Sequence, residues 1–255
     1  MRVLITGAGS YLGGAILGAL RKQGVEADEL DVRGALPEKA FQGYDRVVHV
    51  AGIAHRKETP ENRPLYEQVN HRLAVEIARA AKAQGVRQFV FFSTMSVYGK
   101  VTGRITADTQ PDPKNAYGAS KWAAEQEIAA LADEHFAVAV LRPPMIYGKG
   151  CRGNYQSLRR LILKTPMFPR CGNQRSMLYV GNLCLFMGRL LESGQGGLYF
   201  PQNREYVSTD GLAREIAKAN GKKLWQPKGF GGLLWALGRR SSLFGKVFGS
   251  LTYDQ

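Results

Sequence analysis

The chain has 255 residues, of which 44% are hydrophobic, and no apolar run approaches the roughly 18 uncharged residues that a membrane-spanning helix needs. Its 35 lysines and arginines exceed its 21 carboxylates, which gives a net charge of +14. Three cysteines and four histidines lack metal-ligand spacing, which argues against a zinc site, and the start of the chain has no signal-peptide pattern, so we expect a cytoplasmic protein with reduced thiols.

The first half of the chain alternates short apolar runs with amphipathic stretches. In chain order it predicts a strand at 2–6, a helix at 11–22, strands at 25–32 and 46–50, a helix at 64–83, a strand at 87–92, a helix at 118–134 and a strand at 137–141. The strands are continuously apolar, which is typical of a parallel sheet covered on both faces. We therefore expect an α/β fold with a Rossmann-like, doubly wound parallel sheet.

The pattern becomes less regular after Pro143 and Pro144. Helices are predicted near 155–163, 180–192 and 208–219. We expect a dinucleotide-binding domain over 1–150 and a smaller, partly irregular substrate-binding part over 151–255, interleaved with the first.

A glycine-rich segment lies between the first predicted strand and the first predicted helix. Glycines there permit a tight turn and a close approach of the backbone to a pyrophosphate, and the start of the helix offers free N–H groups. The position makes this motif far more specific than a glycine cluster alone. The residues expected to contact the cofactor here are Gly7, Gly9, Ser10, Tyr11, Leu12 and Gly13.

Two charged residues follow the second predicted strand, about 20 positions beyond the glycines. Asp31 is placed to bind the adenosine ribose, which favours NAD. Arg33 is placed to bind a 2′-phosphate, which favours NADP. The choice between NAD and NADP stays open on these residues.

Tyr117 and Lys121 are four residues apart at the start of a predicted helix and therefore share one face. An ammonium group near a phenol lowers the pKa of the phenol, which can then act as a general base on a hydroxyl. The spacing by itself is weak, because a chain with 11 tyrosines is expected to contain about 0.6 such pairs by chance. Its weight comes from the hydroxyl-rich loop Ser93–Gly99, which leaves a predicted buried strand.

Taken together, these motifs resemble the extended short-chain dehydrogenase/reductase family, which includes nucleotide-sugar epimerases, dehydratases and reductases. The resemblance covers residues 1–215. It is carried by Thr6–Gly13, His49–Gly52, Val69–Asn70, Ser93–Gly99, Tyr117–Lys121, Arg142–Gly148 and Arg175–Leu183.

The resemblance implies a role for each matching residue. Thr94 would hydrogen-bond the reacting sugar oxygen, Tyr117 would be the acid and base, and Lys121 would lower the tyrosine pKa and hold the nicotinamide ribose. The cofactor groove would also be lined by Ala51, Gly52, Asn70 and Pro143. The substrate would be contacted by Ser96, Asn154 and Arg175, the last of these at its diphosphate.

The reaction is narrowed by Met95 and Ser96, which stand where dehydratases of this family carry Asp-Glu. Without those carboxylates we expect either a 4-epimerase or a 4-reductase. The favoured interpretation is a UDP-hexose 4-epimerase that oxidises and re-reduces C4. The alternatives are an NAD(P)H-dependent reductase of a UDP-4-keto-deoxysugar in surface-polysaccharide synthesis, and a non-catalytic dinucleotide sensor.

The basic C-terminal segment 229–249 mixes large apolar residues with cations. It could lie on an anionic membrane surface, but a cap over the substrate is the favoured interpretation. No cationic run is interleaved with stacking aromatic residues, so we expect no nucleic acid partner. By analogy with relatives, the predicted helices 64–83 and 118–134 would form a homodimer interface.

Overall fold

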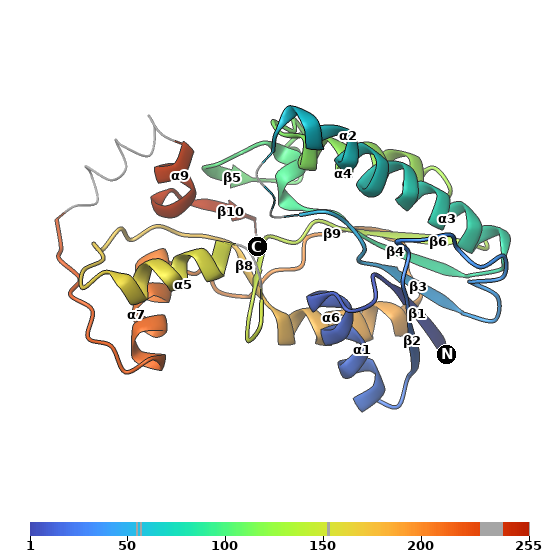
Figure 1. The fold of residues 1–255 in the computed structure, drawn as a ribbon, viewed down its shortest axis with the longest axis horizontal. Coiled ribbons are helices and arrows are strands. Elements are labelled where there is room, and N and C mark those ends of the chain that lie inside the picture. The colour runs from blue at the N-terminus through green and yellow to red at the C-terminus, as the bar shows by residue number, and fades with distance from the viewer. Residues whose placement is uncertain (55, 57, 152–153, 230–241, 255) are drawn as a thin grey trace. The chain divides into compact units, whose positions relative to one another are not determined.

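The computed structural model describes residues 1–54, 56, 58–151, 154–229 and 242–254 (Figure 1). The chain packs as two units and passes between them several times. We call residues 1–99, 111–144 and 179–201 the sheet unit, and residues 100–110, 145–178 and 202–255 the basic unit.

The sheet unit is built on six parallel strands in the order β2-β1-β3-β4-β6-β9. They are β1 Arg2–Thr6, β2 Glu26–Leu30, β3 Arg46–His49, β4 Gln88–Phe92, β6 Ala137–Leu141 and β9 Gly197–Tyr199. The central strand β4 is buried along its whole length, as expected for a strand covered on both faces. The predicted α/β fold with a doubly wound parallel sheet is confirmed.

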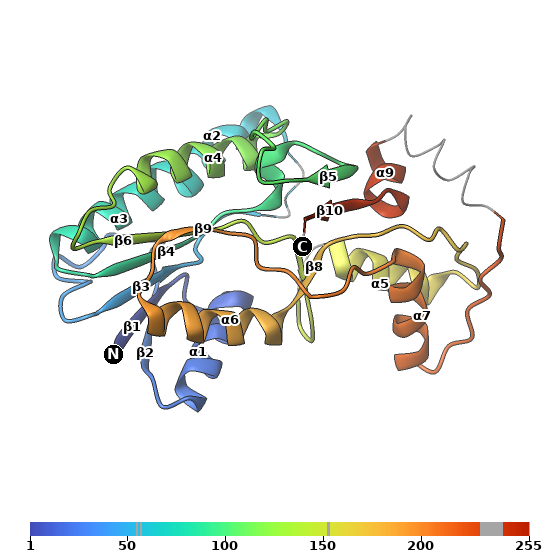
Figure 2. The same cartoon turned by 180° about the vertical axis from the view of Figure 1, so that it is seen from behind.

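Helices cover both faces of this sheet (Figures 1 and 2). Helices α1 (Tyr11–Lys22) and α6 (Val180–Ser193) lie on one face. The other face carries α2 (Arg63–Tyr66), α3 (Leu73–Ala83) and α4 (Ala116–Ala129). Short 3₁₀ turns occupy Pro60–Asn62 and Met95–Tyr98.

Two predicted helices differ from the observed ones in informative ways. The helix predicted at 64–83 contains a π-helical turn, η2, over Glu67–Arg72 between α2 and α3. The helix predicted at 118–134 ends at Ala129, because the Asp133 carboxylate accepts hydrogen bonds from the backbone N–H groups of His135 and Phe136 and closes a turn instead.

The basic unit has a small core of its own around Ile162, Phe168 and Met177. Its helices are α5 (Asn154–Lys164), α7 (Thr209–Ala219) and α9 (Ser242–Phe248). Its strands form two pairs, β5 (Gly103–Ile105) with β10 (Leu251–Tyr253), and β7 (Met145–Tyr147) with β8 (Met177–Tyr179).

Charge divides unevenly between the two units. The sheet unit has 17 lysines and arginines against 16 carboxylates, and the basic unit has 18 against 5. A net charge of +13 therefore falls on the basic unit and only +1 on the sheet unit.

Candidate active site

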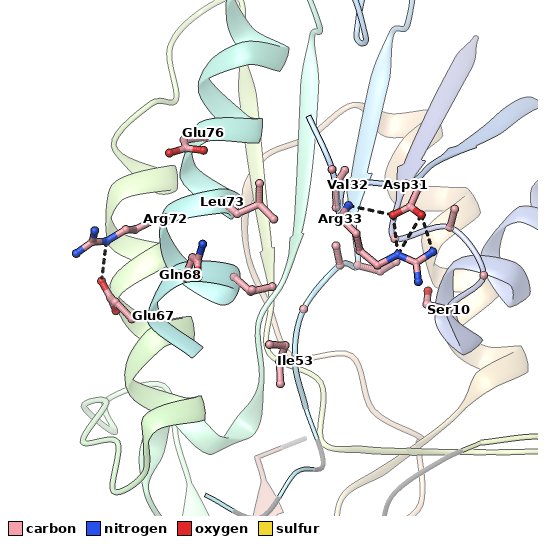
Figure 3. Close-up of a pocket in the computed structure, with 18 of the residues that line it drawn as sticks. Ser10, Asp31, Val32, Arg33, Ile53, Glu67, Gln68, Arg72, Leu73 and Glu76 are labelled. Atoms are coloured by element: carbon pink, nitrogen blue, oxygen red, sulfur yellow. Dashed lines mark hydrogen bonds and ion pairs between the residues drawn. The ribbon is translucent and has the colours of Figure 1, made fainter. Parts of the chain in front are cut away.

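The glycine-rich segment forms one wall of a cavity of about 1000 Å³ within the sheet unit (Figure 3). Gly7 and Gly9 have φ angles of 99° and 70°, which side chains other than glycine rarely adopt. A Cβ atom on Gly7 would lie 3.0 Å from the backbone nitrogen of Ala51, so glycine also permits this close approach. The turn therefore leads into α1, and the backbone of the turn lies against the cavity.

Ser10 stands at the N-cap of α1, where its hydroxyl accepts a hydrogen bond from the N–H of Gly13 at 3.0 Å. The serine thus stabilises the start of the helix. Gly7, Gly9 and Ser10 line the cavity, whereas Tyr11, Leu12 and Gly13 form the first turn of the helix behind it. The start of α1 faces the cavity and offers a favourable place for an anionic phosphate.

Asp31 and Arg33 lie at another edge of the same cavity (Figure 3). The Nε of Arg33 donates to both carboxylate oxygens of Asp31, at 2.9 and 3.0 Å. These hydrogen bonds from Arg33 lower the pKa of Asp31 to about 2. Asp31, which suits a ribose, and Arg33, which suits a 2′-phosphate, are therefore paired with each other. This geometry favours neither NAD nor NADP.

Gly52, Asn70 and Lys121 meet behind the cavity wall. The Asn70 side chain accepts from the N–H of Ile53 at 2.7 Å and donates to its carbonyl at 3.0 Å. A Cβ atom on Gly52 would lie 2.9 Å from Asn70 Oδ1 and 3.3 Å from Lys121 Nζ. Only glycine at position 52 lets the loop that lines the cavity pack this closely on the amide and the ammonium.

Lys121 is almost completely buried, and its Nζ lies 4.6 Å above the ring of Phe91. Burial lowers the pKa of Lys121 to about 8, and the charge of Glu125 opposes this shift. The lysine is therefore poised to change its charge just above neutral pH.

Tyr117 lies in the first turn of α4, with its hydroxyl close enough to the Thr94 side chain for Thr94 to influence the tyrosine pKa. Two residues fix the start of this helix: Asn115 accepts from the N–H of Gly118 at 2.7 Å, and Glu58 accepts from the N–H of Ala116 at 2.8 Å. The two hydroxyls predicted to act on one sugar oxygen are thus side by side.

Burial raises the pKa of Tyr117 in this structure, although the Thr94 side chain acts in the opposite direction. The Lys121 ammonium is not among the groups that shift it. Tyr117 is therefore protonated at neutral pH as the chain stands, and the lowering of its pKa by Lys121 stays a prediction for the loaded site.

Two further predicted residues, Ser96 and Pro143, lie near Thr94. Ser96 lies in the 3₁₀ turn after β4, and its carbonyl would be 2.7 Å from a Cβ atom on Gly118. The N–H of Met95 donates to the carbonyl of Pro143 at 3.0 Å, which ties the ends of β4 and β6 together. Both predicted residues therefore lie in the same corner of the sheet unit as the catalytic candidates.

A buried ionic network lies beneath this corner and was not predicted from the sequence. Glu125, one turn after Lys121 on α4, accepts two hydrogen bonds from Arg142 to one oxygen, at 2.9 and 2.6 Å, and one from the Ser93 hydroxyl. Arg142 also donates to the Tyr98 hydroxyl at 2.7 Å. The network joins α4 to the ends of β4 and β6, the elements that carry Tyr117, Thr94 and Pro143.

The available signal for this network was the spacing Tyr117, Lys121, Glu125, which places the three residues on one helical face. A carboxylate on that face has to be paired when the helix packs on the sheet, and Arg142, which directly follows the predicted strand 137–141, is a cation placed to pair with it.

The comparisons with known proteins agree with this geometry. The model of the NAD dependent epimerase/dehydratase family matches residues 3–199. The chain belongs to this family. The match confirms the resemblance to the extended short-chain dehydrogenase/reductases that the sequence motifs carry.

Curated members of the family include a UDP-glucose 4-epimerase of Vibrio cholerae, 32% identical over 80% of this chain and 63% of its own length. Another is the N-acetyl-alpha-D-glucosaminyl-diphospho-ditrans,octacis-undecaprenol 4-epimerase of Escherichia coli O157:H7, 29% identical over 73% of this chain and 58% of its own length. The chain thus spans about three fifths of the length of these relatives.

Solved structures share the fold at lower identity. A UDP-glucuronic acid 4-epimerase from Bacillus cereus superposes with a TM-score of 0.77 at 18% identity and covers 100% of this chain and 90% of its own. A dTDP-4-dehydrorhamnose reductase from Clostridium acetobutylicum has a TM-score of 0.75 at 22% identity and covers 90% of this chain and 84% of its own. Epimerases and reductases of the family therefore share this architecture.

The remaining predicted site residues belong to the basic unit. Arg175 is half-buried, its Nη1 donates to the carbonyl of Gly249 at 2.8 Å, and burial lowers its pKa. Within the described residues it forms no ion pair with a carboxylate. Asn154 is the first residue of α5, and its side chain lies outside the described part of the structure.

Two further sequence expectations concern metals and membranes. Among the residues that the structure describes, no cluster of three histidines, cysteines or carboxylates is arranged to hold a metal ion. None of the described helices combines the length and apolar character of a membrane span. Cys151, Cys171 and Cys184 are free thiols.

Proposed function

We propose that this protein is an NAD(P)-dependent 4-epimerase of a sugar linked to a diphosphate, with Thr94, Tyr117 and Lys121 as its catalytic residues. The observation that carries this proposal is the proximity of the Thr94 and Tyr117 side chains, with Lys121 one helical turn from the tyrosine. The three groups lie in the same unit as the cavity behind the glycine turn.

The cavity fits a dinucleotide. The start of α1 and the turn at Gly7 and Gly9 would hold the pyrophosphate, and Asp31 or Arg33 would hold the adenosine ribose or its phosphate. Ala51 and Gly52 line the same cavity. When bound, the nicotinamide cofactor accepts a hydride from C4 of the sugar and can return it.

The residues of the chain supply the proton chemistry. Thr94 holds the C4 oxygen, and Tyr117 takes its proton while the C4 hydrogen leaves as hydride, so that the hydroxyl becomes a ketone. The buried Lys121 favours the phenolate form of Tyr117, because a positive charge stabilises a nearby negative one. In the return step Tyr117 gives the proton back to the oxygen.

The 4-reductase is the second candidate, because it needs the same three residues and only the return step. Its support is a relative named UDP-2-acetamido-2,6-beta-L-arabino-hexul-4-ose reductase in Pseudomonas aeruginosa, 30% identical over 62% of this chain. The epimerase is favoured by the higher coverage of the relatives with that name. Met95 and Ser96 still disfavour dehydration, since they supply no carboxylate.

The group beyond the diphosphate is a nucleotide in one relative's name and a polyprenol in another's. Arg175, a cation without an ion-pair partner among the described residues, is suited to a diphosphate in either case. We favour a UDP-linked sugar. Cytoplasmic location and a homodimer through α3 and α4 stay predictions.

Product analysis with purified protein tests the proposal. We expect UDP-hexoses and UDP-N-acetylhexosamines to be interconverted at C4 without net consumption of cofactor. If these sugars remain unchanged while a UDP-4-keto sugar oxidises NAD(P)H stoichiometrically, the epimerase is wrong and the reductase is correct.

A further inference from the structure

The basic unit carries many positive charges that the proposed reaction does not need. Residues 145–178 contain seven lysines and arginines and no carboxylate. Arg175 is the one cation of this stretch that the proposed function employs. Among the described residues of this stretch, Lys149, Arg160, Lys164 and Arg170 are exposed, which calls for a separate explanation.

Helix α5 shows one exposed face that combines cations with an apolar side chain. Its exposed residues Ser157, Arg160, Leu161 and Lys164 follow the spacing i, i+3, i+4, i+7, so they form a single stripe. Leu161 is 47% exposed, whereas its neighbour Ile162 is buried in the core of the unit. A single exposed leucine is ordinary on a protein surface, so its significance depends on further apolar side chains beside it.

Two more exposed apolar residues lie just beyond the C-terminal end of the helix. Met167 pairs with Trp225 in a short parallel bridge, and the N–H of Trp225 donates to the carbonyl of Pro166 at 3.0 Å. Met167 is 41% exposed and Trp225 is 68% exposed. The bridge holds both side chains beside the C-terminal end of α5.

Lys222 fastens the second segment to that end of the helix. Its Nζ donates to the last-turn carbonyls of Ile162 and Leu163, at 2.8 and 2.7 Å. This contact stabilises the negative end of the helix dipole and brings the exposed Lys223 to the same place. Helices α5 and α7, which the segment follows, lie side by side within the unit in both views (Figures 1 and 2).

The resulting face, which we call the α5 patch, consists of Leu161, Met167 and Trp225 with Arg160, Lys164 and Lys223 around them. Among the described residues none of these three cations forms an ion pair. Tryptophan is favoured at the boundary between lipid headgroups and acyl chains, and unpaired lysines and arginines are attracted to anionic phospholipids. A single tryptophan without stacking neighbours is not the platform that single-stranded nucleic acid needs.

We propose that the α5 patch docks this protein onto the surface of an anionic phospholipid membrane. The apolar side chains enter the headgroup region, and the cations bind lipid phosphates above it. The inference does not depend on the proposed function.

Flotation of the full chain with vesicles tests this proposal. We expect binding to vesicles of phosphatidylcholine with 30% phosphatidylglycerol, no binding to pure phosphatidylcholine, and release by high salt, because surface charge attraction is screened. The double substitution Arg160→Glu and Lys164→Glu should weaken binding by about tenfold or more. Trp225→Ser should weaken it as well, through the apolar contact.

A matched control separates this face from net charge alone. Lys22→Glu with Arg189→Glu changes the charge equally at two exposed positions of the sheet unit, and it should bind the vesicles almost as the unsubstituted chain does. Equal losses in both double variants would overturn the assigned face. The assigned face would also be overturned if vesicle binding were lost only in the double variant Leu234→Ser with Trp235→Ser, whose positions lie outside the described residues.

If the unsubstituted chain does not bind anionic vesicles, the proposal is wrong. This holds also if the protein binds an RNA oligomer instead. Interconversion of soluble UDP-hexoses is measured in parallel without vesicles. It reports on the proposed function alone, so failure of one idea is distinguishable from failure of the other.

Discussion

The two units use charge in opposite ways. The sheet unit has nearly equal numbers of positive and negative residues, many of which form ion pairs, and the pair of Glu125 and Arg142 is buried next to the catalytic candidates. In the basic unit the cations of the α5 patch face solvent without a carboxylate. Charge is thus part of the internal framework of one unit and a surface property of the other.

This contrast predicts that substitutions of the catalytic candidates and of the buried ion pair in the sheet unit impair chemistry or folding, whereas those on the α5 patch change neither. The largest effect is expected for Tyr117→Phe, which removes the proton-transferring hydroxyl. We expect kcat to fall by about 10²–10⁴-fold, with cofactor affinity, followed by NADH fluorescence, little changed. Equal function with and without the tyrosine hydroxyl would favour the dinucleotide sensor.

The next effect concerns the buried ion pair. Glu125→Gln leaves the Arg142 cation without its charge partner, and we expect the free energy of unfolding to fall by about 3–5 kcal/mol, since an uncompensated buried charge is costly. Urea denaturation measures this change. Arg142→Gln added to Glu125→Gln should recover part of the loss, and strictly additive losses would contradict a direct coupling.

Lys121 makes the stability of the sheet unit depend on pH. Its pKa is about 8 in the folded chain, against about 10.5 for an ordinary lysine, so between these values the unfolded chain binds more protons. Stability should therefore rise with pH across this window, by about 1–3 kcal/mol relative to Lys121→Met. Parallel pH profiles of the two proteins would show that Lys121 is not perturbed.

The smallest effect is expected on the α5 patch. Arg160→Glu with Lys164→Glu breaks no ion pair and buries no charge, so the free energy of unfolding should change by less than about 0.5 kcal/mol. Thermal unfolding measures it. A large loss would mean that these cations stabilise the basic unit itself, and the contrast between the units would not hold.

The sequence predicts the parts of the fold that rest on local pattern. Continuous apolar runs predicted the central strands, and the glycines at 7 and 9 predicted the turn into α1. Strand β9, at Gly197–Tyr199, was not predicted because two of its three residues are exposed and it carries no apolar run. The strands of the basic unit were missed as well, because three residues are too few to show a periodic pattern.

The site was predicted where one motif holds the relevant groups and missed where distant segments supply them. Tyr117 and Lys121 share a helical face, which spacing alone indicates. The partnership of Glu125 with Arg142 depends on the packing of α4 against β6, and no local pattern contains that information. The π-helical turn that carries the buried Asn70 was also not predicted, because the spacing of apolar residues in the sequence gives no sign of it.

The ion pair between Asp31 and Arg33 has a consequence for how the family's cofactor preference can evolve. Loss of Arg33 alone leaves a bare carboxylate, suited to the ribose hydroxyls of NAD, and loss of Asp31 alone leaves an unpaired guanidinium, suited to the phosphate of NADP. A single substitution at either position therefore changes which cofactor this edge of the cavity suits. Because both residues are exposed, neither step disturbs the core of the sheet unit.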